Sequence, residues 1–172
     1  KMAGMLTAVY IGGTGNMMQG NYIGTDASGS LALRNERSGI TIVGGNSNLI
    51  GGTTAAARNV ISANKLSGVF ITTNSLGNLV QGNFIGVDVT GTNALGNGAD
   101  GVSINSAGSN TIGGTTAGAR NIISGNTNYG VEIFNAGATA NLIQGNYIGP
   151  GVNGHSALAH KLSGMHILSP AN

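Results

Sequence analysis

Glu132 and His166 are the two residues of this chain whose types and spacing best suit proton transfer. Each is the second residue after the glycine of a Gly-x-x-Ile segment, in residues 130–133 and 164–167. If these segments are strands on neighbouring turns of one repeat, the two side chains are adjacent, with Cβ atoms about 5 Å apart. A carboxylate beside an imidazole can act as a proton-transfer dyad. The alternative is a surface charge pair, which contributes less than ~1 kcal/mol.

The chain has few carboxylates with which to build a catalytic or metal site. Glycoside hydrolysis needs two carboxyl groups ~5–10 Å apart, and Asp88 and Asp100 would meet only if their shared loop folds back. Asp26 and Asp88 each begin an Asp-x-x-Gly segment, so we expect them to cap turns. A Ca²⁺ ligand is the alternative, although one carboxylate per loop is few for an ion that takes about 6–8 oxygens. The five carboxylates are Asp26, Glu36, Asp88, Asp100 and Glu132.

Other signals of catalysis in the sequence are weak. His155, His160 and Lys161 lie near one another in the last long loop, a weak metal signal that is more typical of a solvated loop. The sequence has no Gly-x-Ser-x-Gly nucleophile elbow and no phosphate-binding loop. We therefore expect no cofactor. The weak catalytic candidates are Glu132, His166 and Asp100.

An internal repeat must position all of these residues. The segment 19–24, Gln-Gly-Asn-Tyr-Ile-Gly, recurs after 62 residues and, after a further 63, once more. Residues 39–67 and 101–129 are identical at 16 of 29 aligned positions. Inside each unit, Gly-x-x-Ile recurs at steps of 29, 33, 29 and 34 residues, and each step holds three short apolar runs bounded by Gly and Asn. This pattern predicts a solenoid with three short strands per turn and two turns per unit.

The repeat predicts an all-β fold, a right-handed parallel β-helix of about five turns and the first strand of a sixth, forming a single domain over residues 1–172. Strands one turn apart would pair in parallel, about 4.8 Å from each other. An Asn precedes one run in each turn and would bond to the next Asn in the stack. Two loop types, at 51–58 and 25–38, would alternate. The expected core columns are Ile42, Ile71, Ile104, Ile133 and Ile167; Met18, Ile50, Val80, Ile112 and Ile143; and Ile23, Ile61, Ile85, Ile123 and Ile148, and the Asn column is Asn48, Asn78, Asn110 and Asn141.

One outward-facing column changes its residue in every turn, whereas most other positions repeat. A variable column on a constant scaffold is where we expect a binding face. The column consists of Tyr10, Thr41, Phe70, Ser103, Glu132 and His166. A second outward set, Tyr22, Phe84 and Tyr147, recurs, and we expect Leu33, Leu95 and Leu158 of the long loops to cover it. Arg58 and Arg120 share one repeat position and are expected to bond to loop carbonyls.

Composition excludes several classes of protein. Of the 172 residues, 32 are Gly, none is Cys and only 7% are charged, far below the ~25% of ordinary soluble domains. A hydrophobic fraction of 40% with a net charge of +2 does not fit disorder. No apolar run approaches the ~20 residues of a membrane span. The seven Lys and Arg are scattered, so nucleic acid is not an expected partner.

The repeat resembles that of a known group of proteins. Asn-x-Ile-Gly-Gly-Thr-Thr-Ala-x-Ala-Arg-Asn-x-Ile-Ser, followed by Gln-Gly-Asn-[Tyr/Phe]-Ile-Gly, resembles the tandem parallel β-helix repeats of large bacterial surface and secreted proteins, which are similar in fold to the pectate-lyase-like superfamily. The resemblance covers nearly the whole chain and implies an extracellular or cell-surface location. That superfamily includes lyases, hydrolases, epimerases, tailspikes, adhesins and ice-binding proteins, so the fold does not choose a function.

Three functions follow from these observations. We favour a non-catalytic structural or adhesive module that binds a polysaccharide or cell-surface glycan through Tyr10, Thr41, Phe70 and Ser103. The alternative is a polysaccharide-active enzyme, for which Glu132, Asp100 and His166 must converge in a groove. The third is an ice-binding face, for which the recurring Thr-Thr pairs at 53–54 and 115–116 are poorly placed, in loops two turns apart. Both ends lack a cap in the sequence, so we expect a piece of a longer array or, alternatively, end-to-end self-association.

Overall fold

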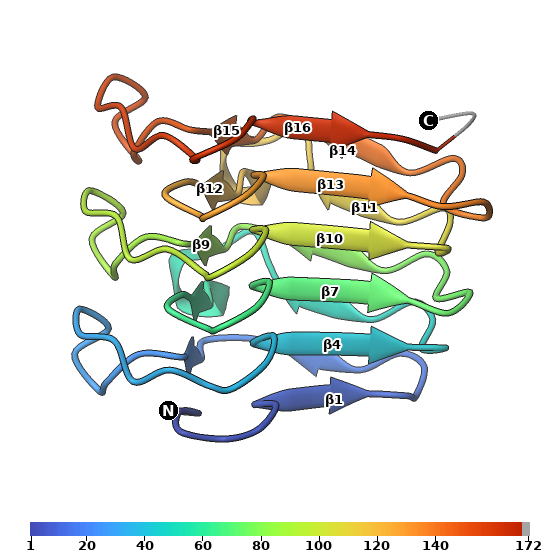
Figure 1. The fold of residues 1–172 in the computed structure, drawn as a ribbon, viewed down its shortest axis with the longest axis horizontal. Helices are drawn as coiled ribbons and strands as arrows, with labels where there is room; N and C mark the ends of the chain where they lie inside the picture. Colours follow the sequence, from blue (N-terminus) through green and yellow to red (C-terminus); the bar gives the residue numbers. More distant parts are fainter. Residues whose placement is uncertain (170–172) are drawn as a thin grey trace.

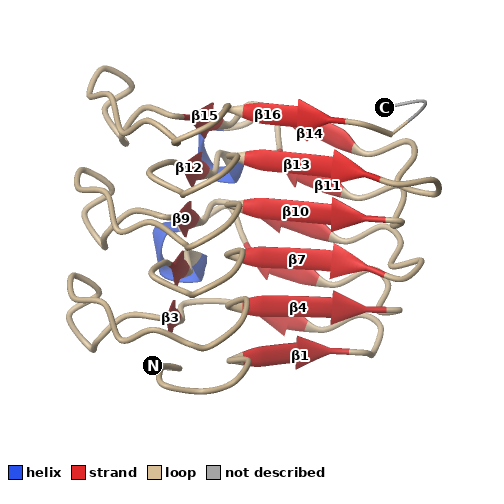
Figure 2. Ribbon diagram, in the orientation of Figure 1, coloured by secondary structure: helices blue, strands red, loops and turns tan. Residues whose placement is uncertain are grey.

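Sixteen short strands wind into three parallel sheets within residues 1–169, the part of the chain that the structure describes. This structure is a computed structural model, and it shows a parallel β-helix of about five turns (Figures 1 and 2). In Figure 1 the front strands run to the right, the chain returns behind them and climbs towards the C-terminus, which is a right-handed path. The predicted fold class is therefore confirmed. No helix among these residues has the length and apolar character needed to cross a lipid bilayer.

Each turn contributes one strand to each sheet. The six-stranded sheet contains β1 (Val9–Ile11), β4 (Ile40–Val43), β7 (Val69–Thr72), β10 (Val102–Asn105), β13 (Val131–Phe134) and β16 (Met165–Ile167). The second sheet contains β2 (Met17–Met18), β5 (Leu49–Gly51), β8 (Leu79–Gln81), β11 (Thr111–Gly113) and β14 (Leu142–Gln144). The third sheet contains β3 (Tyr22–Ile23), β6 (Val60–Ile61), β9 (Phe84–Ile85), β12 (Ile122–Ile123) and β15 (Tyr147–Ile148). Two 3₁₀ turns, η1 (Ala55–Ala57) and η2 (Ala117–Ala119), occupy the alanine-rich loops.

The core consists of the three predicted columns of apolar side chains and a fourth that was not predicted, formed by Ile40, Val69, Val102 and Val131. Parallel pairing places Ile42, Ile71 and Ile104 directly above one another, and the other two predicted columns align in the same way. These side chains are fully buried in the middle turns, whereas Ile167 in the last strand is 44% exposed. Burying one such side chain stabilises the fold by roughly 1.5–3 kcal/mol. The stacked columns therefore hold the turns together.

Asparagines, buried in the middle turns, form a ladder at each of the three bends of the coil, of which the sequence predicted one. In each ladder the side-chain amide nitrogen donates to the side-chain oxygen of the Asn in the next turn, at 2.8–3.2 Å. The same oxygen accepts the backbone N–H of the preceding rung, as Asn78 does from Asn48. A bend leaves backbone groups that no sheet can pair, and burying them unpaired is costly. The ladders are Asn16, Asn48, Asn78, Asn110 and Asn141; Asn21, Asn59, Asn83, Asn121 and Asn146; and Asn35, Asn64, Asn97 and Asn126.

Candidate functional site

The outward column of the six-stranded sheet lies in the predicted register. Tyr10 pairs with Thr41, Phe70 follows on the next strand, and the column continues to β16. Tyr10 is 66% exposed. Ser103 is only 3% exposed, so its predicted role as an exposed binding residue is wrong. Ser103 lies between Phe70 and Glu132 on the two neighbouring strands, and its side chain is hydrogen-bonded to the buried carboxyl of Asp100.

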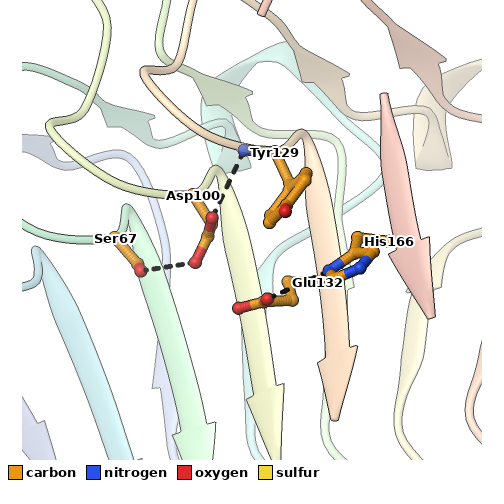
Figure 3. Close-up of polar contacts among 5 residues, drawn as sticks. All are labelled: Ser67, Asp100, Tyr129, Glu132 and His166. Carbon is orange, nitrogen blue, oxygen red and sulfur yellow. Dashed lines mark hydrogen bonds and ion pairs between the residues drawn. The ribbon is translucent and has the colours of Figure 1, made fainter. Parts of the chain in front are cut away.

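Four polar or aromatic side chains gather at the C-terminal end of this face (Figure 3). Glu132 on β13 and His166 on β16 are adjacent, with the Oε1 and Nδ1 atoms 3.2 Å apart. The ring of Tyr129 stacks on that of His166 with centroids 4.4 Å apart. Asp100 lies immediately before Gly101, the residue that precedes β10, and is only 5% exposed. We call Asp100, Tyr129, Glu132 and His166 the acid–aromatic cluster.

The carboxyl of Asp100 has a pKa that its surroundings shift. Burial raises the pKa of its carboxyl above the ordinary value, and the negative charge of Glu132 raises it further. Three hydrogen bonds, from the backbone of Tyr129 and the side chains of Ser67 and Ser103, oppose this shift without cancelling it. The Ser67 hydroxyl donates to Oδ2 at 3.4 Å, and the backbone N–H of Tyr129 donates to Oδ1 at 3.3 Å. Asp100 therefore holds a proton more readily than an exposed aspartate.

The cluster brings together the three weak catalytic candidates. The predicted adjacency of Glu132 and His166 is confirmed, and Asp100 lies close enough to Glu132 for their charges to interact. Carboxyl and imidazole groups this close together can donate and accept hydrogen bonds from the same patch, which suits either sugar hydroxyls or acid–base chemistry.

Asp88 does not join the cluster and is held within its own loop. Its carboxylate accepts hydrogen bonds from Thr90 and Asn93. Burial alone would raise the pKa of Asp88, but these hydrogen bonds outweigh it and lower the pKa. Asp26 caps the matching turn by accepting from Ser28 and Leu31, so both turn-capping predictions are confirmed. Within residues 1–169, no three His, Asp or Glu side chains are grouped to hold a metal ion.

Sequence reasoning missed Tyr129 and Ser67, although a signal for both was present. The residue before each recurring Gly of the six-stranded sheet is Ser in three turns but Asp or Tyr in the other two. These positions stack in successive turns, since the N–H of each recurring Gly donates to the carbonyl of the next such residue. The criterion of variation that picked out the outward column would have found Tyr129, and Ser67 only as the neighbour of Asp100 in the stack. The stacked residues are Ser38, Ser67, Asp100, Tyr129 and Ser163.

The histidines of the last long loop do not form a metal site. His160 is turned inward, where Nε2 lies 3.1 Å from the carbonyl oxygen of Ile123 and Nδ1 is buried without a hydrogen-bond partner. His155 is exposed in the loop. Burial lowers the pKa of His160 below its ordinary value. The N–H of Lys161 donates to the carbonyl of Asn126, which places His160 at the next rung of the third Asn ladder.

The aromatic set on the third sheet is covered in part by the predicted leucines and in part by an arginine. Phe84 is only 3% exposed, and Leu158 packs against this apolar cluster. Leu33, however, is 40% exposed, so it does not provide the predicted cover. The guanidinium of Arg58 lies over the Phe84 ring instead. The predicted hydrogen bond from this arginine to a loop carbonyl is also present, to Gly82.

Comparison of the chain with protein-family models, with curated proteins and with solved structures finds no match. Function must therefore be argued from the side chains that this β-helix presents.

Proposed function

We propose that this chain is an extracellular adhesive module that binds a polysaccharide along the outer face of its six-stranded sheet. The observation that supports this proposal is the contrast between that face and the rest of the scaffold. The outward column changes from Tyr10 to Thr41 to Phe70 along the first turns and ends in the acid–aromatic cluster. The core and the Asn ladders keep the same residue types turn after turn.

The side chains of this face suit the chemistry of sugars. Tyr10 and Phe70 offer aromatic faces on which the apolar side of a sugar ring can stack, while Glu132 can accept hydrogen bonds from sugar hydroxyls. The sheet fixes their backbone positions, with strands about 4.8 Å apart. A rigid, preformed row of contacts loses little conformational entropy when a linear chain binds along it.

An extracellular location is part of the proposal. It is supported by the resemblance of the repeat to those of bacterial surface and secreted proteins, whose fold is similar to that of the pectate-lyase-like superfamily. A structural role in a longer array fits the same picture, because a stack of turns separates its two ends and presents one face along its length.

A polysaccharide-active enzyme is the second candidate, and one observation favours it. Asp100 carries a raised pKa beside the carboxylate of Glu132, and hydrolysis of a glycosidic bond uses one protonated and one ionised carboxyl group. We rank it second because Asp100 is only 5% exposed, whereas a general acid has to reach the leaving oxygen of its substrate.

The test is a panel of neutral and acidic polysaccharides, followed both for retention of the protein and for release of reducing or unsaturated ends. We expect retention without product. Phe70→Ala and His166→Ala should each weaken retention by roughly three- to tenfold, the loss that one aromatic contact produces. Thr111→Ala, on the outer side of the second sheet, is the matched control and should leave retention unchanged.

Two outcomes would overturn the proposal. Product release that is abolished by Glu132→Ala would make the acid–aromatic cluster an active site. Absence of both retention and product across the panel would leave a structural scaffold that does not bind glycans.

A further inference from the structure

Arg58 and Arg120 occupy the same place in successive repeat units and are held in the same way. The Arg58 guanidinium carbon lies 4.1 Å from the centroid of the Phe84 ring, and that of Arg120 lies 4.1 Å from the centroid of the Tyr147 ring. Each Nε donates to a backbone carbonyl, of Gly82 at 3.3 Å for Arg58 and of Gly145 at 3.0 Å for Arg120. A ring below and a carbonyl beside it fix each guanidinium in one orientation.

Neither arginine has a carboxylate partner among residues 1–169. The ion pairs in that part of the chain join Lys65 to Glu36 and His166 to Glu132. Burial lowers the pKa of Arg58 from its ordinary value, but an arginine side chain stays charged in proteins. The Nε hydrogen bond uses one of five N–H donors, so the two Nη groups of each side chain remain to bind an anion.

The two side chains line one notch on the outer side of the third sheet. It has a volume of about 110 Å³, and its other lining residues are Phe84, Ala117, Ile122 and Val152. Ile122 lies between Phe84 and Tyr147 in the strand register, so the two guanidiniums are two strand spacings, or about 10 Å, apart. The notch therefore presents two fixed cations above the nearly buried Phe84 and Ile122, and no acidic residue lines it.

We infer that this two-arginine notch binds the carboxylate or sulfate groups of an acidic polysaccharide. A guanidinium binds either group through two parallel hydrogen bonds. Two turns of the solenoid span about the length of a disaccharide, so the arginines match acidic groups on alternate sugars. Nucleic acid fits less well, because following a phosphate backbone requires a longer row of cations. The inference concerns a different sheet from the proposed carbohydrate face and is independent of it.

The test measures binding by calorimetry at low salt to an oligogalacturonate, its methyl ester, dextran sulfate and a DNA duplex. We expect binding to the oligogalacturonate or to dextran sulfate, and the stronger of the two identifies the anion. The neutral ester should bind at least tenfold more weakly. Arg58→Gln and Arg120→Gln should each weaken binding of the preferred anion about tenfold, the loss expected for one charged hydrogen-bonding group.

Two further variants separate a specific site from net charge and from unfolding. The matched control is Arg34→Gln with Arg37→Gln, which removes two exposed arginines elsewhere and should change affinity less than twofold. Arg120→Lys keeps the charge but loses the planar fork, so it should weaken binding nearly as much as Arg120→Gln. Thermal unfolding of each variant shows that the fold is retained.

The inference would be overturned if the Arg34 and Arg37 double variant weakened binding as much as the notch variants, or if DNA bound as tightly as the acidic oligosaccharides. Retention lost in Phe70→Ala but not in the arginine variants would support the carbohydrate face and reject the notch. Loss in the arginine variants alone would do the reverse.

Discussion

The interior bends repeat the same residue type in every turn, whereas the outer face of the six-stranded sheet changes its residue type from turn to turn. At the bends, Asn48, Asn78 and Asn110 repeat one residue type and one hydrogen-bonding pattern in every turn. On the outer face, Phe70, Ser103 and Glu132 occupy equivalent positions in successive turns and share no chemistry. Both sets stack at the same strand spacing, so the difference does not come from the backbone.

The contrast shows which positions the fold constrains. A buried amide must find partners for its donors and acceptor, and an identical amide in the next turn supplies them. An exposed side chain on the outer face can form its hydrogen bonds with water, so the fold does not require a particular residue type there. Positions that vary on a repeating scaffold are therefore the places to look for binding, and positions that repeat are the places to look for stability.

The largest expected effect is the removal of an inner rung. Asn78→Ala deletes the side chain that donates to Asn110 and Gly45 and accepts from Asn48. Buried groups are left unpaired, and each costs roughly 1–3 kcal/mol, so we expect a loss of about 3 kcal/mol in urea unfolding. Asn16→Ala in the exposed first rung of the same ladder is the control and should cost less than about 1 kcal/mol. Equal losses would show that burial does not determine the cost of a rung.

The next effect concerns the rung where the third ladder changes residue type. His160→Asn replaces an imidazole whose Nδ1 is buried without a partner by the side chain of the other rungs. An Asn there can bond to Asn126, and we expect a gain of about 1 kcal/mol at pH 7.5.

The same substitution should change how stability depends on pH. Burial lowers the pKa of His160 in the folded chain, so below the ordinary value of 6.5 the unfolded chain binds a proton that the folded chain excludes. Stability of the unsubstituted chain should therefore fall as the pH drops below about 6.5, and the fall should be shallower in His160→Asn. Urea unfolding at pH 7.5 and pH 5 measures this, with His155→Asn in the exposed loop as the control. Parallel pH profiles in all three proteins would contradict the assignment.

On the outer face, Asp100→Asn should stabilise the chain by about 1 kcal/mol at pH 7. The raised pKa of Asp100 means that its ionised form is disfavoured by burial and by the charge of Glu132. The folded chain binds a proton more readily than the unfolded chain, so this cost is present above the folded pKa and disappears as the pH falls towards 3.8. Urea unfolding at pH 7 and pH 4 tests both statements. A loss of stability at pH 7 would mean that the hydrogen bond from Ser67 requires the carboxylate.

The fold could be predicted from the sequence because the same pattern of three apolar runs recurs in each of about five turns. The isoleucine columns and the register of Glu132 with His166 follow directly from the steps between recurring glycines. The two further ladders were missed because asparagine is also common in turns, and a turn Asn and a ladder Asn are the same residue in the sequence. The cover on Phe84 was assigned to leucines alone because apolar residues usually bury aromatic rings; Leu158 does pack on this cluster, but the Arg58 guanidinium also lies over the ring.

The acid–aromatic cluster was predicted in part, for a related reason. Strand register determines neighbours along a column, so the Glu132 and His166 contact was accessible from spacing alone. Tyr129 and Asp100 lie where the chain enters the strand, and the direction of a side chain at such a bend depends on local backbone angles that the repeat does not encode. The burial of Ser103 was missed because its side chain is hydrogen-bonded to Asp100, which enters from the loop before the strand.

The smallest expected effect on stability is in the Glu132 and His166 pair. Their side chains are 19% and 34% exposed, and water screens such a pair, so a double-mutant cycle of Glu132→Gln and His166→Gln should give a coupling below about 1 kcal/mol. In contrast, the same variants should weaken polysaccharide retention more than they change stability. The Asn ladder should show the opposite: Asn78→Ala should change stability far more than it changes polysaccharide retention, when retention is measured for equal amounts of folded protein. A coupling of several kcal/mol between Glu132 and His166 would place this pair with the ladders, as a structural contact, and would remove it from the binding face.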